Sequence, residues 1–220
     1  MAGKKILVTG ATGFVGRSLC SLLVELGYIV IPTARVQPSD QSGWDYFVTG
    51  NISESTDWLH GLVDVDVVIH LAARAHVIDD HVANPLAEYR RQNTTPTMKL
   101  GRDALESGVR RFIFISSVGV NGAETFGKPF RSGDVALPHS PYAISKYEAE
   151  LGLRSLFQGT GTELVVVRPP LIYGLDAPGN FALIVKLLEK GVPIPLGGIS
   201  NKRSFIALDN FIDLLEICIS

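Results

Sequence analysis

The chain has 220 residues and a formal net charge of −2; 46% of its residues are hydrophobic and 19% are charged. This composition provides a sizeable core and excludes global disorder, and no Lys/Arg block points to a nucleic-acid or membrane-surface partner. No segment approaches the length of a transmembrane helix. With two cysteines and no disulfide framework, the sequence predicts a cytoplasmic protein that binds neither nucleic acid nor membrane.

Short β-branched runs alternate with longer amphipathic patterns along most of the chain. Strands are predicted at Lys5–Thr9, Ile29–Thr33, Tyr46–Val48, Val65–Leu71, Arg111–Ser116 and Glu163–Arg168, and helices at Phe14–Leu26, Pro85–Ser107 and Pro141–Phe157. Alternating strands and helices indicate βαβ units, in which helices cover both faces of a parallel sheet. The predicted fold class is therefore α/β, a doubly wound parallel sheet of the Rossmann type.

The composition changes after Pro169-Pro170 and becomes richer in Pro and Gly around one helical run at Phe181–Glu189. This change predicts a small, incomplete substrate lobe. Ser204–Leu208 then predicts a strand, and Asn210–Cys218 predicts a helix that begins but does not finish. We expect a Rossmann domain over residues 1–168, a partial lobe over 169–202, and a return to the first domain over 203–220, in a chain that is truncated.

A glycine-rich loop follows the first predicted strand and opens the first helix. Its glycines, Gly10, Gly13 and Gly16, are spaced G-x-x-G-x-x-G. Gly10 allows a tight turn, Gly13 lets the helix N-terminus approach a pyrophosphate, and Gly16 lets the helix pack closely on the sheet. The loop predicts a dinucleotide site; the alternative is a tight strand–helix turn with no ligand.

The end of the second predicted strand bears on the choice between NAD and NADP. NAD sites usually place an acidic residue there to hold the ribose 2′-hydroxyl, but this chain has Thr33-Ala34-Arg35. Arg35 suits a 2′-phosphate, so the sequence favours NADP over NAD, unless Arg35 is a solvated loop residue. Asn51-Ile52 follows the third strand, where an amide would meet the adenine edge or simply face solvent.

Tyr142 and Lys146 lie four residues apart in the third predicted helix, and therefore on the same helical face. A lysine ammonium close to a phenol favours the phenolate and lowers the tyrosine pKa toward neutrality. The pair then forms a general base for an alcohol or sugar hydroxyl. Ser116 and Ser117 end the fifth predicted strand ahead of this pair.

These motifs together resemble the extended short-chain dehydrogenase/reductase family, in its nucleotide-sugar epimerase/dehydratase branch. The resemblance covers essentially the whole chain. It is carried by the segments Thr9–Gly16, His70–Ala73, Ser116-Ser117, Tyr142/Lys146 and Arg168–Gly174. It implies an NAD(P)-dependent enzyme that reacts at C4 of a nucleotide-diphosphate sugar, with UDP as the expected nucleotide, in cell-surface polysaccharide precursor metabolism.

The resemblance also assigns roles to individual residues. Tyr142 becomes the acid/base, Ser117 orients the reacting sugar hydroxyl, and Lys146 holds the nicotinamide ribose. The implied cofactor contacts are Gly10, Thr12, Gly13, Phe14, Val15, Gly16, Arg35, Asn51, Ile52, Leu71, Ala72, Ala73, Asn93, Ser116, Tyr142, Lys146, Pro169 and Leu171. The implied substrate contacts are Ser117, Asn180, Pro195, Leu196 and Arg203, whose guanidinium suits a diphosphate.

Departures from the family pattern restrict the reaction. Dehydratases of this branch carry an Asp-Glu pair after the catalytic hydroxyl residue, whereas Ser117 is followed by Val118-Gly119, so 4,6-dehydration is not expected. A 4-epimerase and a 4-ketoreductase both stay open, as does a non-catalytic NAD(P) sensor on the same fold. The histidines show no metal-ligand spacing, so no metal is expected. The resemblance also implies a homodimer that packs through the 85–107 and 141–157 helices.

Overall fold

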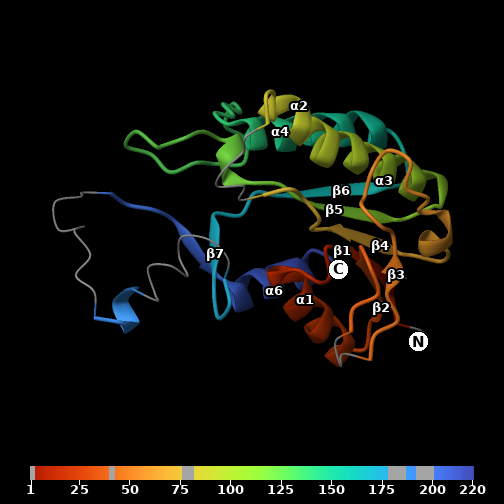
Figure 1. Ribbon diagram of the computed structural model, residues 1–220. Coiled ribbons are helices and arrows are strands. Elements are labelled where there is room, and N and C mark those ends of the chain that lie inside the picture. Colours follow the sequence, from red (N-terminus) through yellow and green to blue (C-terminus); the bar gives the residue numbers. More distant parts are fainter. Residues whose placement is uncertain (1–2, 40–42, 76–81, 178–186, 192–200) are drawn as a thin grey trace.

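The computed structural model describes residues 3–39, 43–75, 82–177, 187–191 and 201–220. Its centre is a six-stranded sheet in the order β3-β2-β1-β4-β5-β6 (Figure 1). The strands are β1 (Lys5–Thr9), β2 (Ile29–Ala34), β3 (Phe47–Val48), β4 (Val67–His70), β5 (Arg111–Ile115) and β6 (Glu163–Val167). Every neighbouring pair is parallel, which confirms the predicted doubly wound sheet. All parallel strands then end at one edge, where such folds bind ligands.

The central strand β1 alternates its side chains between two cores. Ile6 and Val8 face one core and Leu7 the other, and all three are fully buried. A strand that is buried on both faces reads as a continuous apolar run, because successive side chains point to opposite sides. This explains why Ile6-Leu7-Val8 predicted a buried strand correctly.

One face of the sheet is covered by α1 (Phe14–Glu25) and α6 (Leu208–Ile217). Leu19 and Leu23 of α1 pack with Phe211 and Leu215 of α6 in a single core cluster. Figure 1 shows both helices below the sheet. α6 therefore packs beside α1, and it begins slightly earlier than the predicted Asn210–Cys218.

The opposite face is covered by α2 (Pro85–Tyr89), η2 (Arg90–Thr94), α3 (Thr95–Glu106) and α4 (Pro141–Phe157), drawn above the sheet in Figure 1. The single helix predicted over Pro85–Ser107 is divided by η2, a π-helical turn in which Thr95 N–H donates to the Arg90 carbonyl. Pro96 explains the division, because it has no N–H to continue the α-helical ladder. The helical path continues through the π turn.

A second, two-stranded sheet joins β7 (Leu171–Tyr173) to β8 (Phe205–Ala207). The strands are parallel, with Ile172 opposite Ile206. β8 was predicted over Ser204–Leu208, but β7 was not, since Leu171 follows two prolines and three residues show no period. This pairing brings the segment after the proline pair beside the segment that leads into α6.

Shorter elements complete the fold, namely the 3₁₀ turns η1 (Leu59–Leu62) and η3 (Val118–Val120). The predicted helix at Phe181–Glu189 lies largely outside the described residues, so the lobe over 169–202 stays a prediction. Across the described ranges, no helix is long and apolar enough to cross a membrane.

Candidate active site

The glycine loop between β1 and α1 has the geometry that a pyrophosphate needs. Gly10 has a φ of 70°, which favours glycine. A Cβ on Gly16 would lie 2.2 Å from the Gly10 carbonyl oxygen. Gly13 is the N-cap of α1 and has no side chain to occupy the first N–H groups of the helix. These residues fit a dinucleotide, since the donors and the positive end of the helix dipole stay available to an anion.

A chain of hydrogen bonds fixes the strand end beside this loop. Ala72 N–H donates to Thr9 Oγ1 at 3.1 Å, and the Thr9 hydroxyl lies 2.7 Å from His70 Nδ1. We infer that the ring proton is on Nε2, which then donates to Thr97 Oγ1 at 2.9 Å. Burial, with a smaller effect of the Lys146 charge, lowers the pKa of His70 to about 3. His70 is thus a neutral core histidine that orders the Leu71-Ala72 strand end.

The two serines after β5 differ in what their hydroxyls contact. Ser117 Oγ accepts a hydrogen bond from Gly119 N–H at 3.1 Å, which leaves its own proton to donate outward. Ser116 Oγ is buried and has no hydrogen-bond partner within the described residues. A buried hydroxyl without a partner is uncommon in folded proteins. Ser116 therefore fits the predicted contact with a cofactor.

Tyr142 lies in the first turn of α4, and its ring meets the edge of Tyr89 with centroids 5.9 Å apart. Burial, followed by the charge of Tyr89, raises the pKa of Tyr142 to about 12. The prediction that Lys146 lowers the pKa of Tyr142 is therefore wrong for the protein without a cofactor. The physical reason is that burial penalises the phenolate, while the lysine runs down toward the sheet.

The side chain of Lys146 is buried, with 2% of its surface exposed. Its ammonium sits over the Phe114 ring, 4.5 Å from the centroid, in a cation–π contact. Burial lowers the pKa of Lys146 to about 7, and the carboxylate of Glu150 opposes this decrease. The lysine is held one turn below Tyr142, and its pKa lies close to neutral pH.

Asn93, which the family resemblance singled out, lies in the π turn and bridges two segments. Its side chain accepts from Arg74 N–H at 2.7 Å and donates to the Arg74 carbonyl at 3.2 Å. It also donates to Ser145 Oγ at 3.2 Å. These hydrogen bonds connect the loop after β4 to α4 beside Lys146, so Asn93 holds the two segments together. Whether it also touches a cofactor stays a prediction.

The remaining predicted cofactor contacts divide by exposure. Arg35 is exposed directly after β2, and Asn51 is exposed after β3. The half-buried ones are Ile52, Leu71, Pro169 and Leu171, while Ala73 is exposed. Thr12, Phe14 and Val15 lie in the glycine loop and at the start of α1. All follow the carboxyl ends of strands, except for Leu171, which begins β7.

The predicted substrate contacts are only partly placed. Asn180, Pro195 and Leu196 lie outside the described residues. Arg203 is exposed in the segment before β8, where its role as a diphosphate ligand stays a prediction.

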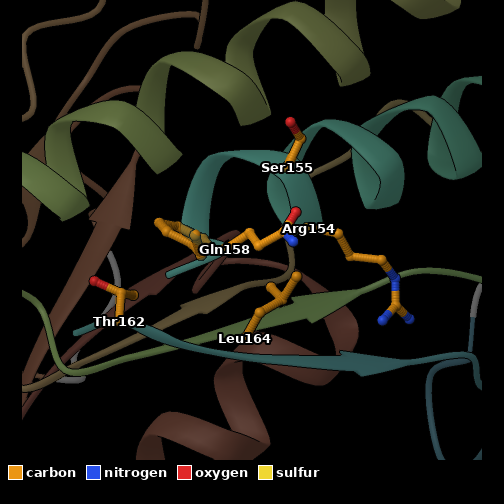
Figure 2. Close-up of a pocket in the computed structure, with 6 residues that line it drawn as sticks. Arg154, Ser155, Gln158, Thr162 and Leu164 are labelled. Carbon is orange, nitrogen blue, oxygen red and sulfur yellow. The ribbon is translucent and has the colours of Figure 1, made fainter. Parts of the chain in front are cut away.

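A hollow of about 430 Å³ lies elsewhere, between the end of α4 and the start of β6. Figure 2 shows Leu164 pointing up toward Gln158, while Ser155 points away from the strand. Since Thr162 and Leu164 are at the amino end of β6, this hollow lies at the opposite edge of the sheet from Tyr142. It is not part of the candidate site.

The sequence profile of the NAD dependent epimerase/dehydratase family matches residues 6–219. The chain belongs to this family. A UDP-glucose 4-epimerase of Vibrio cholerae is 45% identical over 219 residues, which are 98% of this chain and 66% of that protein. An uncharacterized protein of Sinorhizobium fredii, y4nG, is 27% identical over 99% of this chain and 53% of its own length. The chain therefore spans between about half and two thirds of these relatives.

Solved structures support the same family. A UDP-N-acetylglucosamine 4-epimerase from Methanobrevibacter ruminantium, in complex with UDP-N-acetylmuramic acid, superposes with a TM-score of 0.84 at 25% identity, over 100% of this chain and 74% of that one. A UDP-glucuronic acid 4-epimerase from Bacillus cereus, in complex with UDP-glucuronic acid and NAD, gives 0.83 at 25% identity, over 98% and 73%. The extended short-chain dehydrogenase/reductase resemblance and the Rossmann fold are thus confirmed.

Several residues that contact the candidate site were not predicted from the sequence. Phe114 and Tyr89 looked like ordinary core aromatics, and nothing in their spacing marks a contact with Lys146 or Tyr142. Glu150 had a usable signal, because Tyr142, Lys146 and Glu150 recur every four residues on one helical face. Arg168, quoted only as the start of a motif, is its ion-pair partner.

Proposed function

We propose that the chain is the reacting part of a nucleotide-sugar 4-epimerase that acts at C4 of a UDP-linked sugar. The observation that carries the proposal is the placement of Ser117, Tyr142 and Lys146 at the edge of the sheet where the glycine loop also ends. η3 packs against α4, with Gly119 beside both Ser117 Oγ and Ala143. The 45% identity to a protein named UDP-glucose 4-epimerase supports the same reaction.

Each of the three groups has a distinct task in the proposed reaction. Tyr142 exchanges a proton with O4 of the sugar as the general acid/base. Ser117 donates a hydrogen bond to the same oxygen, since its Oγ already accepts the Gly119 N–H. Lys146 holds the ribose that carries the nicotinamide. A bound NAD would supply the hydride acceptor and donor that chemistry at C4 requires.

The pKa of Tyr142 decides when the proton moves. At about 12, the phenol is protonated at neutral pH and is a proton donor at rest. A positive charge beside it, such as that of an oxidised nicotinamide ring, favours the phenolate. With such a cationic group bound beside it, Tyr142 would be able to take a proton from O4.

A 4-ketoreductase is the second candidate, and Arg35 is the observation that favours it. Arg35 is exposed after β2, where its guanidinium would meet the 2′-phosphate of NADP, and reductases that consume a free cofactor commonly use NADPH. Arg35→Ala should weaken NADP binding and leave NAD binding unchanged. Isothermal titration with both dinucleotides measures this, with Arg102→Ala, also exposed, as the control.

The deciding experiment separates the two reactions by their cofactor demand. We expect the purified protein to interconvert UDP-glucose-type and UDP-galactose-type sugars with no added cofactor or with catalytic NAD, as followed by chromatography. Consumption of NADPH that depends on a supplied 4-keto sugar would establish the reductase instead. Dinucleotide binding with no turnover across a panel of nucleotide sugars would instead favour a non-catalytic NAD(P) sensor.

We further propose a homodimer formed through the outer surfaces of α3 and α4. Leu151 of α4 is 49% exposed, and the two helices lie side by side on one face of the sheet (Figure 1). Light scattering should give twice the chain mass, and Leu151→Glu should reduce it to the monomer. A wild-type protein that stays monomeric at high concentration contradicts the proposal.

A further inference from the structure

Tyr142, Lys146 and Glu150 lie on successive turns of α4, and the last two are buried. Glu150 is fully buried, with 0% of its surface exposed. Arg168 donates to both oxygens of its carboxylate, from Nε at 2.9 Å and from Nη2 at 2.5 Å. This bidentate geometry is the strongest form of an arginine–carboxylate pair.

Arg168 also connects the helix to the segments around the serine. Its Nη1 donates to Asn121 Oδ1 at 3.2 Å, just after η3. The next residue, Pro169, accepts from Val118 N–H at 3.0 Å. The ion pair therefore links α4, the end of β6 and the turn that follows Ser117.

The charge around Lys146 is unbalanced without Glu150. The groups that interact with the lysine are Phe114 from β5, His70 from β4 and Glu150 from its own helix, with Arg168 paired to Glu150 beyond. His70 and Tyr142 are neutral at pH 7, with pKa values of about 3 and about 12. Glu150 is the anion whose charge raises the pKa of Lys146 among the described residues.

We propose that Glu150, held by Arg168, is a positioning residue whose carboxylate keeps the Lys146 ammonium charged one turn below Tyr142. This inference rests on the proposed function, which needs a cationic lysine at the cofactor ribose. It adds that the cation depends on a carboxylate that touches neither cofactor nor substrate. Removing the carboxylate leaves Lys146 buried between a neutral histidine and an aromatic ring, where the ammonium is disfavoured.

The test compares Glu150→Gln with Glu148→Gln. Glu148 is on the same helix and forms its own arginine pair, with Arg90, but on the surface. For Glu150→Gln we expect the alkaline limb of the kcat/KM profile to move to lower pH, with about a tenfold loss above the limb for each unit of movement. Glu148→Gln should leave the profile in place. An unmoved limb in a folded Glu150→Gln variant overturns the inference, as does an equal shift in Glu148→Gln.

A second measurement does not depend on turnover. Nitrogen-15 NMR of the lysine side chains reports the titration of Lys146, assigned by Lys146→Met. Its midpoint should fall in Glu150→Gln and recover in Glu150→Asp. If the wild-type protein has no activity but the midpoint moves, the proposed reaction fails and the charge coupling stands. If activity is present and the midpoint does not move, only the coupling fails.

The double variant Glu150→Gln/Arg168→Gln covers the risk of misfolding. It removes both partners of the ion pair, so Arg168 is not left as an unpaired charge, and it should fold even if the single variant does not. The Lys146 midpoint should still lie below that of the wild type, and a midpoint at the wild-type value overturns the inference.

Discussion

The two ends of the parallel sheet carry charge in different ways. At the amino end, Arg111 pairs with Glu163, and Arg110 pairs with Asp66. These are surface pairs, with Glu163 66% exposed and Arg110 71% exposed. At the carboxyl end, Lys146 and Glu150 are both buried. Water screens the first set and is excluded from the second, where burial lowers the pKa of Lys146 to about 7.

The two ends thus differ in how much their charged residues affect the stability of the fold. An exposed ion pair gains and loses little on folding, so its residues are replaceable. A buried lysine lowers the stability of the fold unless something compensates. The carboxyl end keeps such a lysine on the same helix as a half-buried tyrosine, Tyr142, and near a serine, Ser116, whose hydroxyl has no partner within the described residues. Shifted protonation in such a place indicates chemistry. The hollow at the amino end lacks this combination.

The largest expected effect is on turnover at the carboxyl end. Tyr142→Phe removes the proposed acid/base and should lower kcat by about 10²–10⁴, while NAD affinity is retained. Tyr147→Phe, on the same helix, is the matched control and should leave kcat near that of the wild type. Steady-state kinetics measure both, and near-wild-type turnover in Tyr142→Phe would remove Tyr142 from its role.

The buried histidine predicts an intermediate effect on stability against pH. The pKa of His70 is lowered from 6.5 to about 3 by burial, so the folded state binds fewer protons than the unfolded state between these values. The stabilisation is fully present above pH 6.5 and is lost as the pH falls through about 3. In urea titrations, His70→Asn should therefore reduce the pH dependence of the free energy of unfolding between pH 3 and 6.5. The exposed His60 offers a control, since His60→Asn should keep the wild-type slope.

The smallest effect is expected at the amino end. Glu163→Gln removes an exposed pair with Arg111 and should lower the free energy of unfolding by about 0.2–1 kcal/mol. The loss should shrink in high salt, because exposed charges are screened. Denaturant unfolding at two salt concentrations tests this. A loss of several kcal/mol that salt does not change would erase the contrast between the two ends.

The sequence predicted the sheet because its signals are local. Ile6-Leu7-Val8 and the glycines after it are contiguous, and each strand–helix pair repeats the pattern. β7 was missed because Leu171–Tyr173 is extended only through its pairing with Phe205–Ala207, which lies far along the chain. Strand ends also shifted by a residue or two, since backbone pairing and not side-chain type decides them.

The sequence was a better guide to which residues lie at the candidate site than to their protonation. The Tyr142/Lys146 spacing placed both on one face, yet it could not give the depth of burial, which raises the pKa of Tyr142 instead of lowering it. Depth depends on Tyr89 and Phe114, which come from other elements. Arg168 and Glu150 are 18 residues apart in sequence and meet only when β6 lies beside α4.

Lys146→Met gives the most direct test of the claim that buried charge at the carboxyl end serves function at the expense of stability. The pKa of Lys146 is lowered from 10.5 to about 7, so its burial costs most below pH 7, and this cost disappears as the pH rises to 10.5. Methionine fills similar space without charge, and Glu150 keeps its Arg168 partner. We predict that the variant unfolds at a higher temperature than the wild type at pH 6, and that this increase is smaller at pH 9. We also predict that the variant has no turnover. A variant that is less stable at pH 6, or that keeps wild-type turnover, would contradict the account.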